Sequence, residues 1–146
     1  SLDVSKAKEL ESFKLVLYAE KNNSKLKKLD FRKNKKLRLI VIGQTKALKN
    51  IKFNSTCESI YLKETSVKKV DLKKLESLDD FSYFDGPLEE LDISNNPNLE
   101  QIWIKNANIK VLDVSKNPKL RIITVDEGTQ IIGPTNAQIE YNKKAE

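Results

Sequence analysis

The chain has 146 residues, of which 38% are hydrophobic, and 27 Lys or Arg against 21 Asp or Glu give it a net charge of +6. This length suits one domain, and no apolar run approaches the roughly 18 residues of a membrane-spanning helix. With no His and one Cys, the composition excludes an internal disulfide, a zinc site and catalysis by a Ser–His or Cys–His pair. We therefore expect a non-enzymatic protein without a cofactor or a metal.

A short phrase recurs after 21 residues: positions 91–99 read LDISNNPNL and positions 112–120 read LDVSKNPKL. Internal repetition with a period of roughly 20 to 50 residues is typical of solenoids. Extended along the chain, the repeat places apolar residues at the first, fourth, sixth and eleventh positions of a template, and Asn or a small residue at the ninth. A single coil cannot bury its apolar edges, so neighbouring coils are expected to stack.

The first copy is the loosest. Residues 2–5 match the phrase, and because the chain opens inside it without an initiator Met, we expect a piece of a longer protein. The next copy of the phrase starts at Leu29, 27 residues after Leu2. The surplus is placed at residues 18–24 as a polar insert between coils. Such an insert is usually tolerated surface, although an insertion on one coil is also a common place for binding specificity.

Positive charge is concentrated in the first third of the chain. Residues 1–49 hold 14 Lys or Arg and 5 Asp or Glu, a balance of +9, whereas residues 50–146 hold 13 and 16, a balance of −3. The densest stretch, residues 25–38, falls at water-facing template positions and is interpreted as a solvated face. Nucleic-acid binding is not favoured, because the aromatic residues lie elsewhere. An acidic polysaccharide or protein stays open as a partner of this stretch.

The fourth and sixth template positions predict one short β-strand in each coil. Side chains two residues apart on a strand share a face, so this pair enters the core while the fifth position faces water. The pairs are Phe13 and Leu15, Ile40 and Ile42, Ile60 and Leu62, Phe81 and Tyr83, Ile102 and Ile104, and Ile123 and Val125. The Asn or Thr at the ninth position is expected to turn inward and satisfy backbone groups at the bend.

Two other recurring positions are interpreted as structural. Cys57 occupies a first position that Leu fills in other coils, which predicts a buried and inert thiol. A column of Asp on the opposite edge is expected to bond to backbone groups. Its members are Asp3, Asp30, Asp71, Asp92 and Asp113. The adjacent acidic pairs Asp79–Asp80 and Glu89–Glu90 point to opposite sides of an extended chain, so neither forms an acid–base pair.

The water-facing columns of the strands hold the candidate binding residues. The fifth position reads Lys14, Val41, Tyr61, Ser82, Trp103 and Thr124, and the seventh reads Val16, Gly43, Lys63, Phe84, Lys105 and Asp126. Strands about 4.8 Å apart bring Tyr61, Phe84 and Trp103 into one aromatic patch. Exposed aromatic rings are frequent at binding hot spots. Alternatively, they serve cross-strand packing, or a missing segment covers them. The predicted site is Tyr61, Phe84, Trp103, Asp80, Asp85, Gln101 and Lys105, with Asp79 and Glu100 in its polar rim.

The chain divides into a solenoid of about six repeats over residues 1–128 and a tail over residues 129–146. The tail leaves the repeat pattern, and turn residues between its short apolar segments predict a small extended cap that closes the core. We expect the end from Lys143 onward to be frayed.

The phrase at residues 112–120 resembles the short leucine-rich repeats of bacterial cell-surface proteins, similar to the internalin-like class with its period of about 21 residues. The resemblance covers residues 2–128. It implies an α/β-type leucine-rich-repeat solenoid with a parallel sheet on the concave face, turns or short extended segments on the convex face, and little or no regular helix. It also implies a secreted or surface-displayed protein that recognises proteins or glycans outside the cell.

Three functional hypotheses follow. The first is a recognition module that binds a protein or glycan through Tyr61, Phe84 and Trp103. The second is a structural spacer or stalk in a larger surface protein, with the binding site in another domain. The third is an anion-binding surface at residues 25–38, whose affinity would fall steeply with added salt.

Overall fold

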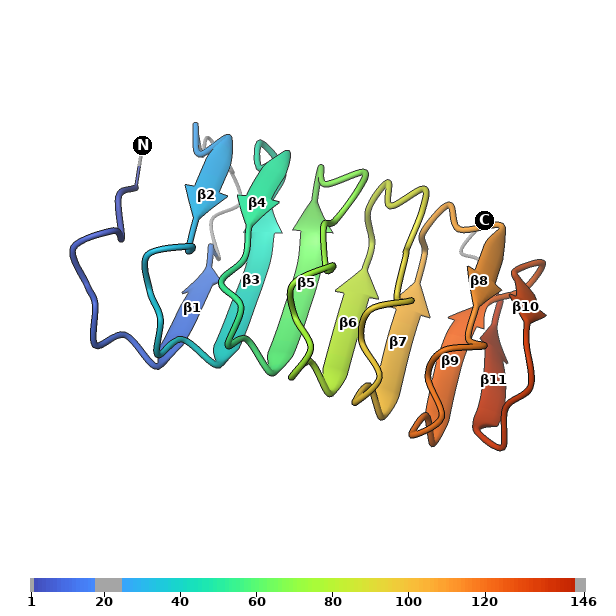
Figure 1. Cartoon of the computed structure of the whole chain (residues 1–146). Coiled ribbons are helices and arrows are strands. Elements are labelled where there is room, and N and C mark those ends of the chain that lie inside the picture. The colour runs from blue at the N-terminus through green and yellow to red at the C-terminus, as the bar shows by residue number, and fades with distance from the viewer. Residues whose placement is uncertain (1, 18–24, 144–146) are drawn as a thin grey trace.

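The computed structural model describes residues 2–17 and 25–143. Within these ranges the chain coils into a parallel β-solenoid (Figure 1), and one seven-stranded sheet, the main sheet, forms one wall. Its strands, in spatial order, are β1 (Ser12–Val16), β3 (Leu39–Thr45), β5 (Ser59–Thr65), β6 (Asp80–Phe84), β7 (Gln101–Lys105), β9 (Ile122–Asp126) and β11 (Gln138–Asn142). All neighbouring strands are parallel. The predicted insert at 18–24 lies outside the described residues, and so does the predicted frayed end apart from Lys143.

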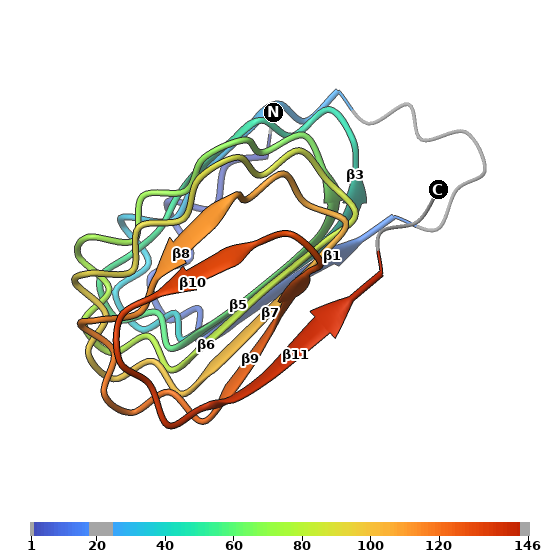
Figure 2. The same cartoon turned by 90° about the vertical axis from the view of Figure 1, so that its right-hand side faces the viewer.

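Shorter extended pieces form a second wall across the core. Here β2 (Lys28–Asp30) pairs with β4 (Asn50–Lys52), and β8 (Val111–Asp113) pairs with β10 (Gln130–Ile132), each pair parallel. Figure 2 shows β8 and β10 facing the main sheet across the coil. No residue of the described ranges is helical. The predicted parallel solenoid without regular helix is therefore confirmed, and the tail predicted to cap it adds one strand to each wall.

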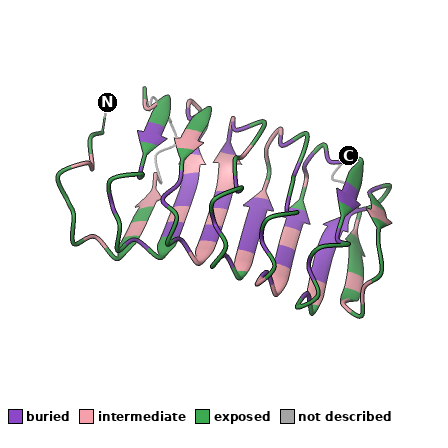
Figure 3. Cartoon of the chain, viewed as in Figure 1, coloured by how far each residue is buried: buried purple, intermediate pink, exposed green. Residues whose placement is uncertain are grey.

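The core fills the space between the two walls, as the purple segments of Figure 3 indicate. On β5, Ile60 and Leu62 are fully buried, whereas Tyr61 between them is only partly buried. This alternation follows from the period of two along a strand. Cys57 is also fully buried, and burial raises the pKa of its thiol to about 12. The prediction of a buried core cysteine is confirmed. A thiol with so high a pKa stays protonated at neutral pH.

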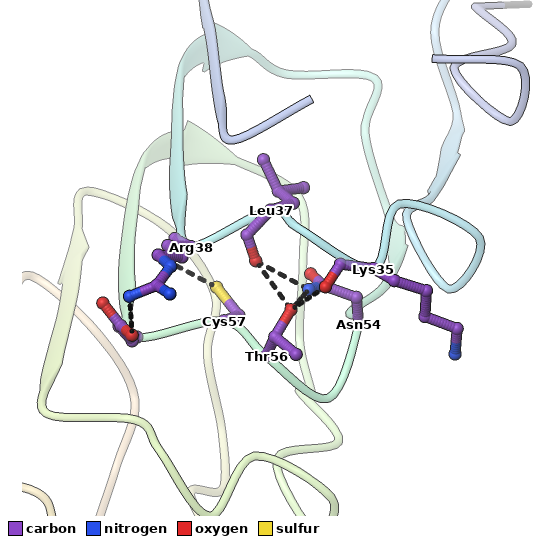
Figure 4. A network of polar contacts seen from close by, with 7 residues as sticks. Lys35, Leu37, Arg38, Asn54, Thr56 and Cys57 are labelled. Atoms are coloured by element: carbon purple, nitrogen blue, oxygen red, sulfur yellow. Dashed lines mark hydrogen bonds and ion pairs between the residues drawn. The ribbon is translucent and has the colours of Figure 1, made fainter. Parts of the chain in front are cut away.

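Buried asparagines connect successive coils. The Nδ2 group of Asn117 donates to the backbone oxygens of Ile93 and Asn96, both at 2.9 Å, and Asn96 repeats the pattern on the coil before it. In Figure 4, Asn54 donates in the same way to the Leu37 oxygen, at 2.6 Å. The bonds of Asn96 and Asn117 confirm the predicted inward Asn. The inward Asn54 was not predicted, because the repeat places Thr56 at that ninth position, and Thr56 is exposed although its hydroxyl donates to backbone oxygens. Thr45 also turns inward, but its hydroxyl has no partner among the described residues, so the predicted bond is wrong there.

Four of the seven main-sheet strands have a residue in the left-handed backbone region at or just after their carboxyl end. These residues have φ between 50° and 57°, and none is glycine: Gln44, Glu64, Asp85 and Asn106. At the opposite edge, the Asp column makes the predicted side-chain-to-backbone bonds within each coil. For example, the Asp113 carboxylate accepts from the Ser115 N–H at 2.9 Å, and this bond holds the pKa of Asp113 below its usual value.

Tyr83 is the largest residue type at the core-facing sixth position, and its surroundings are adapted to it. Its hydroxyl is buried and donates to the Val67 backbone oxygen at 2.8 Å. Gly86 lies directly over this hydroxyl, and a Cβ atom at that position would overlap it. Burial of the phenol raises the pKa of Tyr83 to about 12, so the hydroxyl remains a hydrogen-bond donor at neutral pH.

Candidate binding surface

The predicted binding residues come from three neighbouring strands of the main sheet and the turn that follows β6. The strand register pairs Tyr61 with Ser82 and Ser82 with Trp103, and it pairs Lys63 with Phe84 and Phe84 with Lys105. This is the register that the sequence period predicts. The outward side chains of β5, β6 and β7 therefore form one continuous surface, which we call the sheet face.

Two of the three aromatic rings are in contact. The ring centroids of Tyr61 and Phe84 lie 5.3 Å apart at an interplanar angle of 35°. Trp103 makes no ring contact with another aromatic residue in the described part of the chain, although the register places it diagonal to Phe84 just as it places Tyr61. All three side chains are partly buried. The predicted patch is therefore a contacting pair plus a third ring one strand further along.

Ser82 separates Tyr61 from Trp103. It lies on the central strand of the three, and its short side chain is buried between its two aromatic neighbours. Strands are about 4.8 Å apart, so the Cα atoms of the two aromatic residues are about 10 Å apart. Because Ser82 is only 8% exposed, the larger side chains around it cover most of its surface.

The polar groups around the rings are already held in place. The Trp103 indole N–H donates to Gln101 Oε1 at 3.2 Å, which fixes the ring and the amide together. The Ser82 hydroxyl donates to Asp80 at 3.2 Å. At the far end of the patch, the Asn106 amide donates to Asp85 at 2.6 Å, and Lys63 Nζ lies 3.9 Å from the same carboxylate. Lys105 is exposed beside Phe84.

Carboxylates crowd the start of these strands. The pKa of Asp80 is raised because the group is half-buried, although its bond from Ser82 opposes the shift. The pKa of Asp79 is raised by burial first and then by the neighbouring charges of Asp80, Glu58 and Glu100. Negative charge thus gathers beside the aromatic rings, and a ligand that offers hydrogen-bond donors or positive charge would relieve it.

The sequence prediction named Asp80 and Gln101 but not the full outward row to which they belong. The position two residues before the fifth reads Leu39, Ser59, Asp80, Gln101 and Ile122 across the sheet. Leu39 is 40% exposed and Ile122 is partly buried. The signal was available, because strand alternation puts this row on the same side as the aromatic rings. Apolar surface therefore continues along the sheet face on both sides of the aromatic patch.

The basic stretch is partly neutralised by neighbouring carboxylates. Arg32 forms a two-pronged bond with Asp30, with its shortest distance at 2.6 Å. Arg38 reaches Glu58 on the next coil at 2.9 Å, and Lys36 reaches Glu9 on the preceding one. These pairs are exposed. They favour the interpretation of residues 25–38 as a solvated face, because the pairing lowers the local excess of positive charge.

Comparison with known proteins adds no relative. No family model matches this chain, and neither does any curated protein sequence or solved structure. Within the described residues, no group of three or more His, Cys, Asp and Glu side chains is arranged to bind a metal ion. The same residues contain no helix of the length and apolar character needed to cross a bilayer. The functional argument therefore depends on the sheet face itself.

Proposed function

We propose that this chain is a non-enzymatic recognition module of the leucine-rich-repeat class that binds a protein or a glycan through its sheet face. In this proposal the main sheet is the concave face of the solenoid, and the protein is secreted or displayed on a bacterial surface. The repeat period, the single strand per coil in the main sheet and the buried asparagines between coils support the class.

One observation carries the binding proposal. Tyr61, Phe84 and Trp103 point outward from three adjacent strands, where large rings are not needed to fill the core. Aromatic residues bury a large area at a small entropic cost, and they dominate hot spots for that reason. The sheet backbone and the bond between Trp103 and Gln101 also fix the geometry before a ligand arrives.

The surrounding polar groups would supply specificity. Asp80 and Gln101 flank the rings on one side, and Asp85 and Lys105 flank them on the other. Hydrogen bonds from such fixed groups discriminate between ligands, because an unsuited ligand leaves them desolvated and unpaired. Hydroxyl and amide groups are both suitable partners, so the chemistry accommodates a glycan or a polar peptide segment.

The test uses the only tryptophan in the chain, Trp103, as its own reporter. The intact chain is titrated with a panel of neutral and acidic oligosaccharides and with a displayed peptide library, and Trp103 emission is followed. A bound ligand is expected to shift or quench that emission. Trp103→Ala and Tyr61→Ala should then each lower the affinity for the same ligand by at least about tenfold, measured by calorimetry, as expected for hot-spot residues.

The matched control is Val111→Ala, which removes an exposed apolar side chain from the second wall. This variant is expected to bind the ligand with the same affinity as the unmodified chain. Circular dichroism is used to check that each variant is folded. Equal binding by Trp103→Ala and the unmodified chain would remove the proposed site. A chain whose Trp103 emission responds to no ligand of either class would favour the spacer hypothesis.

A further inference from the structure

The exposed apolar residues of this solenoid gather at its two ends. Five large hydrophobic side chains are exposed among the described residues, and three of them lie in the terminal coils. Leu2 is 44% exposed at the N-terminal end, whereas Ile132 and Tyr141 are 43% and 52% exposed at the C-terminal end.

Tyr141 is exposed although it occupies a core position. The register of β11 on β9 pairs Tyr141 with Val125, and Val125 is fully buried. Ile139 likewise pairs with the fully buried Ile123, yet it is only partly buried. The difference arises because β11 is the edge of the main sheet and no further described strand covers it. The inner edge of this coil is therefore open.

At the other end of the main sheet, no further strand of the described residues lies beside β1. In β1, Phe13 and Leu15 pair with Ile40 and Ile42 of β3, which are fully buried, whereas Phe13 and Leu15 are only partly buried. Edge strands present a row of unpaired backbone donors and acceptors that favours pairing with another strand. Within the described residues, the main sheet thus has two edge strands of five residues each, β1 and β11, at its opposite ends.

We propose that a second copy of this chain stacks on the first head to tail, so that β1 of one copy pairs with β11 of the next. A shift along the solenoid axis keeps the strand direction, so this contact continues the parallel pairing that every neighbouring pair of the main sheet already uses. Continued in the same register, it sets Ile139 beside Phe13 and Tyr141 beside Leu15. The open core of each end closes on the other.

Charge at the junction favours this polarity. The register that aligns the apolar pairs also sets Glu140 of one copy beside Lys14 of the next, and both side chains are exposed in the single chain. Opposite charges directly across a strand pair stabilise it, and like charges destabilise it. A two-fold contact between identical ends would place Glu140 near Glu140, or Lys14 near Lys14. The head-to-tail contact is open, so further copies add in the same way.

This inference is independent of the proposed recognition function. Its first measurement is sedimentation of the intact chain across a wide range of protein concentration. We expect the weight-average mass to rise continuously beyond that of a dimer, because each added copy presents a fresh edge. A chain that stays monomeric overturns the proposal, and so does a mass that stops at a dimer.

Charge reversal then tests the register. Lys14→Glu and Glu140→Lys are each expected to weaken the association constant by about threefold to tenfold, and the double variant is expected to restore it. Glu76→Lys is the control, because Glu76 is exposed in the middle of the stack. This substitution changes the charge by the same amount as Glu140→Lys. Association that responds equally to Glu76→Lys and Glu140→Lys, or that the double variant fails to restore, overturns the proposed contact.

Discussion

The fit between Gly86 and Tyr83 makes a sharp stability prediction. A Cβ atom at Gly86 would overlap the Tyr83 hydroxyl and lie 2.8 Å from the Thr65 backbone oxygen. Forcing extra volume into a packed core costs about 1–3 kcal/mol of unfolding free energy, so Gly86→Ala should lower the melting temperature by several degrees. Tyr83→Phe should cost about 1–2 kcal/mol, because it leaves the Val67 backbone oxygen without its hydrogen bond.

The double variant separates overlap from a general loss of stability. Tyr83→Phe removes the atom that a Cβ at Gly86 meets first, whereas the close Thr65 oxygen remains. The combined cost should therefore be smaller than the sum of the two single costs by about 1 kcal/mol. The free energies come from urea unfolding followed by circular dichroism. Combining Gly86→Ala with Tyr61→Phe is the control and should be additive. Additive costs for Gly86→Ala and Tyr83→Phe would refute the overlap.

Two further predictions concern single carboxylates. Asp126 is 2% exposed and accepts from the N–H groups of Asn106 and Ala107 at 2.9 and 2.8 Å. Asp126→Asn should therefore lower the free energy of unfolding by about 1.5–3 kcal/mol, measured by urea denaturation. An unchanged midpoint of the urea transition would contradict this role. The bond from Arg32 lowers the pKa of Asp30 from 3.8 to about 2. A carboxylate whose pKa is lower in the folded than in the unfolded protein stabilises the folded state at pH values above the unfolded pKa. The contribution of Asp30 to stability should therefore be lost as the pH falls from 3.8 to about 2. In Arg32→Gln, the free energy of unfolding should therefore fall less over this pH range than in the unmodified chain. An equal fall in both proteins would contradict the role of Arg32.

The register of the main sheet could be predicted because two periods agree. The 21-residue repeat fixes which residues share a column, and the alternation along a strand fixes which columns face the core. Together they placed Tyr61 opposite Ser82 and Trp103 without any structure. They did not predict that Trp103 misses the other two rings. Ring contact depends on side-chain direction, which the repeat pattern does not encode.

Some backbone conformations and side-chain directions could not be predicted from the repeat pattern. Gln44 and Glu64 adopt the left-handed backbone conformation, although glycine or asparagine usually marks it. Asp126 looks like one more outward residue of its column, yet it turns toward the backbone of the preceding coil. Neighbouring strands decide both outcomes. The tail at residues 129–146 was predicted to be extended, and its pairing followed from edges that only the folded coils create.

Three buried asparagines bond in the same direction along the chain. Asn34, Asn96 and Asn117 each donate to carbonyls of an earlier coil, which precedes them by 21 to 30 residues. A coil that leaves the ribosome thus meets these acceptors already made, because synthesis proceeds from the N-terminus. The bonds to Asp126 run the other way, since the N–H groups of Asn106 and Ala107 depend on a carboxylate 20 and 19 residues later. The asparagines can therefore bond as soon as their own coil is made, whereas Asp126 completes a coil only after the next one exists.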